Sequence, residues 1–105
     1  MRVLDFIVTQ QTLTRDPLCD FSGLVAGSRG YLSARFRFCK EWAGCKRVAV
    51  FVTGGKEYPV PLVNNMCEIP AQVLTCSTVQ VYVVGQRGTV RITTGTAAFP
   101  QAVRQ

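Results

Sequence analysis

The sequence contains no histidine. Histidine is the commonest general base, the commonest metal ligand and the usual partner of a nucleophilic serine or cysteine. The six Asp and Glu residues are scattered and form no evident pair, and no glycine-rich loop is followed by Lys-Ser or Lys-Thr, as nucleotide hydrolysis would require. These absences predict a protein that is not an enzyme and that carries no cofactor and no metal.

Long apolar runs are absent as well, because every apolar stretch is broken after a few residues. A membrane-spanning helix needs roughly 20 consecutive apolar residues, so we expect no membrane association. The first eight residues include Asp5 and lack an adequate apolar stretch, which argues against a secretory signal and for synthesis in the cytoplasm. A chain of 105 residues, 48% of them hydrophobic, suffices for one core, so we expect a single domain over residues 1–105.

The five cysteines contain no Cys-x-x-Cys pair, and their odd number leaves at least one thiol unpaired in any disulfide scheme. A structural zinc site would need four suitably spaced ligands, and a reactive thiol would need a neighbouring base or a helix N-terminus. Free cysteine is among the most frequently buried residue types. We therefore interpret the cysteines as free, buried packing residues: Cys19, Cys39, Cys45, Cys67 and Cys76.

What the sequence does contain is a series of short β-type runs separated by Gly, Pro and Asn turns. Such runs without helical segments between them indicate an antiparallel sandwich or barrel. We expect a polar connection over 9–20, one helical turn over 70–74 and an extended C-terminal tail over 96–105. The candidate strands cover residues 2–8, 21–25, 31–38, 46–53, 56–62, 66–69, 79–84 and 89–94.

Two of these strands can be placed within a sheet. The run over 46–53 is almost continuously apolar, which predicts a central strand buried on both sides, or one with a covered face and an interface. Pro59 and Pro61 cannot donate ladder hydrogen bonds, so their strand is expected at a sheet edge. The last hairpin is expected to turn at 85–88, between glycines at both ends of the connection.

Positive charge is the other clear feature, with twelve Lys and Arg residues against six acids, a net charge of +6. In the strand over 31–38, Arg35 and Arg37 alternate with apolar residues and so share the solvent face. Such a surface suits an acidic protein or, with tyrosines for stacking, single-stranded nucleic acid. The candidate interaction surface comprises Arg35, Arg37, Lys46, Arg47 and Tyr58.

The order of several motifs resembles the immunoglobulin-like domain of phage baseplate upper proteins and related tail structural proteins. The resemblance spans about two-thirds of the chain and has no counterpart for residues 9–30. It rests on Trp42, the apolar strand ending near Phe51, the segment 67–74 with sequence CEIPAQVL, the segment 79–85 with sequence VQVYVVG, and the segment 91–94 with sequence RITT.

This resemblance implies an immunoglobulin-like antiparallel β-sandwich. It also implies a non-enzymatic structural protein of a phage or prophage virion, located in the tail or baseplate or attached to the capsid. Its expected partners are other virion proteins. The apolar run over 48–52 offers more apolar surface than one core readily covers, so further copies of the chain are expected partners as well. The alternative, drawn from the charge, is a small basic β-barrel that binds single-stranded nucleic acid.

Overall fold

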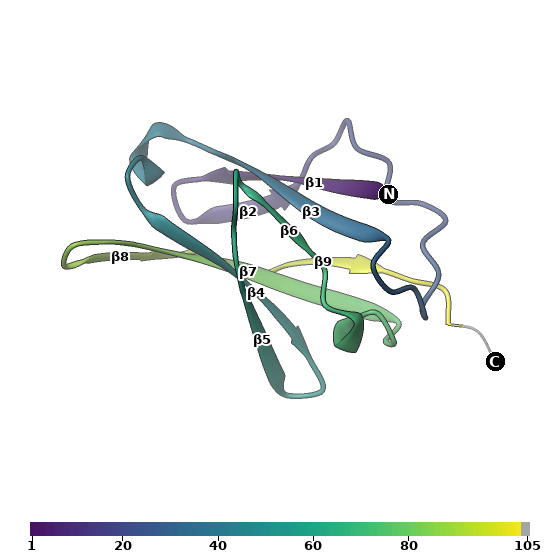
Figure 1. The fold of residues 1–105 in the computed structure, drawn as a ribbon. Coiled ribbons are helices and arrows are strands. Elements are labelled where there is room, and N and C mark those ends of the chain that lie inside the picture. Colours follow the sequence, from purple (N-terminus) through teal and green to yellow (C-terminus); the bar gives the residue numbers. More distant parts are fainter. Residues whose placement is uncertain (104–105) are drawn as a thin grey trace.

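The computed structural model describes residues 1–103 and has two β-sheets packed face to face (Figure 1). The first sheet has the strand order β2-β1-β3-β6. The second sheet has the order β5-β4-β7-β8, and β9 is also paired to β7. No helix among these residues is long and apolar enough to cross a membrane. The strands are β1 (Arg2–Thr9), β2 (Thr12–Arg15), β3 (Leu32–Phe38), β4 (Lys46–Thr53), β5 (Lys56–Pro61), β6 (Met66–Glu68), β7 (Thr78–Arg87), β8 (Val90–Thr93) and β9 (Ala97–Pro100).

The protein is therefore an all-β sandwich with two predominantly antiparallel sheets, in agreement with the predicted immunoglobulin-like fold. One pairing departs from the antiparallel expectation, because β1 and β3 run parallel over seven residue pairs. A parallel pair requires a crossover connection instead of a tight turn. Residues 16–31 supply that connection, and they are anchored by the buried side chains of Phe21 and Leu24.

The predicted strand over 21–25 is wrong for the same reason. Phe21 and Leu24 point into the core from a loop, and only Val25 forms a bridge, to Ala102. The expected polar connection over 9–20 instead begins with a hairpin, because Gln10 adopts a left-handed φ of 55° and turns the chain into β2. Leu13 of β2 points inward from the first sheet and is buried in the core.

The C-terminal segment also differs from the extended tail that we expected over 96–105. Ala97–Pro100 forms β9, which pairs antiparallel with the first half of β7. Its inward side chain Phe99 is 1% exposed and lies near Phe6 and Phe21, so this segment belongs to the core. Residues 104 and 105 of the expected tail lie outside the described residues.

Most of the second sheet agrees with the prediction. β4 lies between β5 and β7, and the strand with Pro59 and Pro61 is at the edge. The last hairpin turns later than expected, after Arg87 and not at Gly85, because β7 runs through Gly85. The predicted helical turn over 70–74 appears as a short 3-10 turn, η2 (Ala71–Val73).

Trp42 closes one end of the sandwich. It ends a second 3-10 turn, η1 (Lys40–Trp42), is fully buried, and donates its indole N–H to the carbonyl of Gln10 at 2.9 Å. Its ring lies against Phe38, with centroids 5.1 Å apart. A Cβ placed on Gly85 would approach the Trp42 ring to 2.6 Å, so glycine is required at this position for a steric reason.

Candidate functional site

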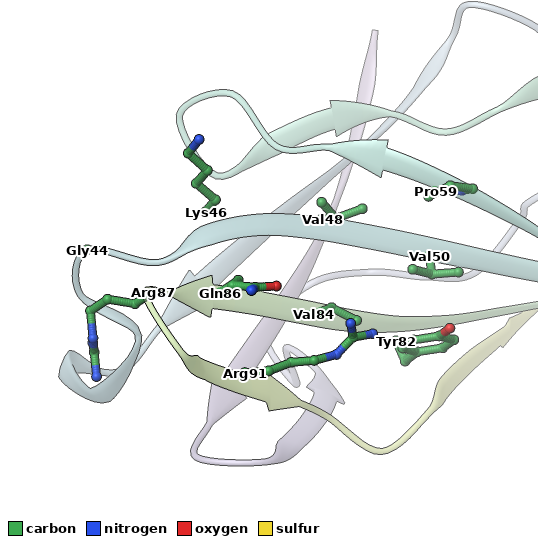
Figure 2. Close-up of a pocket in the computed structure, with 11 residues that line it drawn as sticks. Gly44, Lys46, Val48, Val50, Pro59, Tyr82, Val84, Gln86, Arg87 and Arg91 are labelled. Atoms are coloured by element: carbon green, nitrogen blue, oxygen red, sulfur yellow. The ribbon is translucent and has the colours of Figure 1, made fainter.

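The strongest candidate surface is the outward face of the second sheet. Strand residues alternate between the two faces of a sheet, and β4 is apolar on both. Ala49 and Phe51 point into the core and are fully buried, while Val48 and Val50 point outward. Together with three neighbours from β5 and β7 they line an open groove of about 720 Å³ (Figure 2). We call this surface the valine face, and it comprises Val48, Val50, Pro59, Tyr82 and Val84.

The register fixes the order of side chains on the valine face. Val48 lies opposite Val84 of β7, and Val50 lies opposite both Tyr82 of β7 and Pro59 of β5. Pro59 is exposed, and Val48, Val84 and Tyr82 are half-buried, although no second layer of the described chain pairs with this sheet on its outside. The result is a contiguous apolar surface at the centre of a sheet.

Tyr82 is held in place across this face. Its hydroxyl donates a hydrogen bond to the Glu57 carboxylate at 2.8 Å, so the side chain reaches from β7 over β4 to β5. Val50, between these strands, is only 7% exposed. The hydrogen bond to Glu57 favours the neutral phenol and raises the pKa of Tyr82.

Charge is distributed unevenly along the valine face. At one end Gln86 lies between Lys46 of β4 and Arg91 of β8 in a single row across the sheet. At the other end the corresponding row contains Glu57, Val52 and Gln80. Figure 2 shows Lys46 at one end of the groove and Arg91 reaching along the face toward Tyr82. The face therefore has Lys46 at one end, an apolar centre bordered by the Arg91 side chain, and the single carboxylate of Glu57 at the other end (Figure 2).

The first two residues of the predicted interaction surface lie on the opposite side of the molecule, on the outer face of the first sheet. Arg35 forms a two-point ion pair with Asp5, with nitrogen–oxygen distances of 2.6 and 3.1 Å. Arg37 contacts Asp16 at 3.0 Å, and Asp16 is 6% exposed. These carboxylates neutralise much of the basic face that we expected on this strand.

The other three predicted residues are also separated. Arg47 faces inward: its guanidinium lies 4.3 Å from the Phe38 ring centroid and donates to the Trp42 carbonyl and the Asn65 side chain, both at 2.6 Å. Tyr58 packs against the core from β5. Lys46 alone borders the valine face. The predicted set is therefore divided among two outer faces and the interior.

The groove residues that sequence reasoning missed are Tyr82, Val84 and Arg91, together with Pro59, which was expected only to mark an edge strand. A signal for the first two was present, because 79–84 is apolar at successive positions and so must direct part of its side chains away from the core. No such pattern marks Arg91, whose position depends on the register of the β7–β8 hairpin.

The cysteines agree with the packing interpretation only in part. All five are free, but Cys67 alone is buried, and the others are half-buried. Burial raises the pKa of the Cys67 thiol to about 12. Among residues 1–103, no three His, Cys, Asp or Glu side chains are grouped closely enough to hold a metal ion.

Comparison with known proteins identifies no relative: no family model, no curated protein and no solved structure matches this chain.

Proposed function

We propose that this protein is a non-enzymatic structural component of a phage or prophage particle, in the tail or baseplate or attached to the capsid. It acts through protein–protein contacts made by the valine face. The observation that carries this proposal is the apolar centre of that face, formed by Val48, Val84 and Pro59 at the molecular surface. Protein interfaces have this composition, with an apolar aromatic-containing centre and a charged rim.

The motif order that resembles phage baseplate domains gives the proposed location, and the sandwich fold fits the same resemblance. Small β-sandwiches present rigid sheet faces, so a contact surface on a sheet can be held without the entropy cost of ordering a loop. Val48 and Val84 are on adjacent central strands and are positioned by the ladder itself. The proposed contact surface is thus pre-formed.

Binding of single-stranded nucleic acid is the weaker proposal, because its predicted residues are not assembled into one surface. Arg35 and Arg37 are paired with carboxylates, and Arg47 points inward. A nucleic-acid groove needs cations that are available to phosphates and aromatic rings on which bases stack. The valine face offers one aromatic ring, Tyr82, whose hydroxyl is engaged by Glu57.

The test is the protein content of purified virus particles from the strain that encodes this chain. Quantitative mass spectrometry should find the chain at a fixed ratio to the other particle proteins. Val84→Glu, which places a charge at the centre of the valine face, should reduce incorporation strongly. Leu18→Glu also replaces an apolar residue by Glu, at a position that is 93% exposed in the connection 16–31 between strands of the other sheet, and should incorporate normally. Particles that lack the unchanged protein would refute the proposal.

A further inference from the structure

We infer that the valine face binds a second copy of this chain in a two-fold symmetric dimer, with the strands of the two facing sheets running in opposite directions. This inference rests on the proposed function, since it names the first partner of the same surface. The order of charged and apolar residues along the strands carries this inference. When the second copy runs in the opposite direction, the Lys46 end of one copy meets the Glu57 end of the other, and the two apolar centres meet.

The geometry follows from the register. Outward side chains form four rows across the sheet, and successive rows are separated by about 7 Å, twice the rise per strand residue. The two-fold axis lies in the plane between the two sheets, perpendicular to the strands and midway between the two middle rows. It places each row opposite a different row of the second copy. Val48 and Val84 then face Val50 and Tyr82 of the second copy. The apolar centre of each copy then lies against the apolar centre of the other, with the Arg91 side chain reaching along the β8 side of the contact (Figure 2).

The same operation brings the charged ends together. The row with Lys46 and Arg91 meets the row of the second copy that contains Glu57. Lys46 is on β4 and Glu57 is on the adjacent β5, so the two side chains are offset by one strand spacing, about 5 Å. Two-fold symmetry repeats this Lys46–Glu57 pair at both ends of the interface. Parallel stacking would instead bring like charges together.

An alternative route to self-association, pairing through the β5 edge of the second sheet, is obstructed. β5 is an edge strand. Its hydrogen bonds on one side go to β4, and its other side is free. Pro59 and Pro61 have no N–H, so two positions on the free side of β5 offer no donor to an incoming strand. The prolines therefore protect the β5 edge, while the valine face stays open.

The experiment measures the mass of the full chain by size-exclusion chromatography with light scattering at tens of micromolar. We expect twice the 11.5 kDa of one chain. Val84→Glu should give monomers, and Leu18→Glu, at a residue that is 93% exposed in the connection 16–31, should remain dimeric. Circular dichroism and the melting temperature show whether each variant is folded. Should Val84→Glu fail to fold, Lys46→Glu provides the second test, because Lys46 is exposed.

A charge reversal identifies the orientation. Lys46→Glu and Glu57→Lys should each weaken the dimer about tenfold, because each loses two exposed ion pairs and gains like-charge contacts. The double variant Lys46→Glu/Glu57→Lys should recover most of this affinity. Within one chain the two residues lie in rows about 20 Å apart, so rescue reports a contact between copies.

Each outcome decides the inference. A monomer at all concentrations, a dimer that Val84→Glu leaves intact, or absence of rescue in the double variant overturns it. A protein that is monomeric and binds an acidic particle protein through this face also overturns it. A monomer that is nevertheless found in purified particles refutes the dimer alone and leaves the proposed function standing; a dimer that is absent from particles does the reverse.

Discussion

Replacing Gly85 by alanine tests the close contact that closes the core. A Cβ at this position would lie 2.6 and 2.7 Å from two carbons of the six-membered ring of Trp42. The ring cannot easily retreat, because Trp42 is fully buried, packs on Phe38 and is fixed by its hydrogen bond to Gln10. Either the indole or the β7 backbone must therefore move.

The expected change in the free energy of unfolding is the difference between a stabilising and a destabilising effect of the substitution. Gly85 lies in a strand and has no left-handed φ. Without the clash, alanine would stabilise the protein by about 0.4–1 kcal/mol, because it leaves the unfolded chain less conformational entropy than glycine does. Overpacking a well-filled core costs about 1–3 kcal/mol. We expect the clash to prevail, with a net loss of about 1.3 kcal/mol and a fall in melting temperature of roughly 5–10 °C.

The assay is urea unfolding monitored by circular dichroism and by the fluorescence of the single tryptophan. Gly95→Ala is the matched control, because a Cβ there meets nothing within 4 Å, and it should change the free energy of unfolding by less than about 0.5 kcal/mol. Trp42→Phe should reduce the cost of Gly85→Ala in a double-mutant cycle. A Gly85→Ala protein as stable as the original would refute the steric reasoning.

Four further predictions concern thiol reactivity, titration and binding. Cys67, with a thiol pKa raised to about 12 by burial, should stay unmodified by a thiol reagent at neutral pH until the protein unfolds; modification in the native state would contradict this. Since the ordinary thiol pKa is 9.0, the unfolded chain ionises first, and the contribution of Cys67 to stability should decline from about pH 9 to pH 12 in denaturation curves. In a spectrophotometric titration, Glu57→Gln should lower the pKa of Tyr82 toward its ordinary value, and an unchanged titration would show that their hydrogen bond is absent in solution. Fluorescence anisotropy should detect at most weak binding to single-stranded DNA, lost at physiological ionic strength; tight binding there that disappears in Arg35→Gln/Arg37→Gln would restore the nucleic-acid proposal.

Much of the fold could be predicted from the sequence, because alternation and turn residues are local signals. β3 shows this, with Leu32, Ala34 and Phe36 buried and Arg35 and Arg37 exposed as the pattern requires. β2 and β9 were missed because, unlike the equally short β8, they carry no alternating β-type run, and each is fixed by its pairing with a longer strand. Short edge strands carry too little periodicity to stand out from a connection.

The candidate site was harder to predict, since it depends on which way each residue of β4 points. The sequence indicated a continuous apolar run but not its register against β7. Side chains alternate between the two faces along a strand. Because Ala49 and Phe51 face the core, Arg47 must also point inward and Lys46 must point outward. The carboxylates of Asp5 and Asp16 that neutralise the first sheet lie far away in the sequence, so no local pattern reveals those ion pairs.

The parallel pairing of β1 with β3 has a consequence for how the chain folds. Arg2 pairs with Leu32, so the loop between these strands must close before the first sheet can form, whereas the β4–β5 and β7–β8 hairpins need only neighbouring residues. During synthesis the β1–β2 hairpin is complete while β3 is still unmade. Until the second sheet has also been made, the side chains of Leu4, Phe6 and Val8 have no opposing layer, which leaves the nascent hairpin exposed to aggregation.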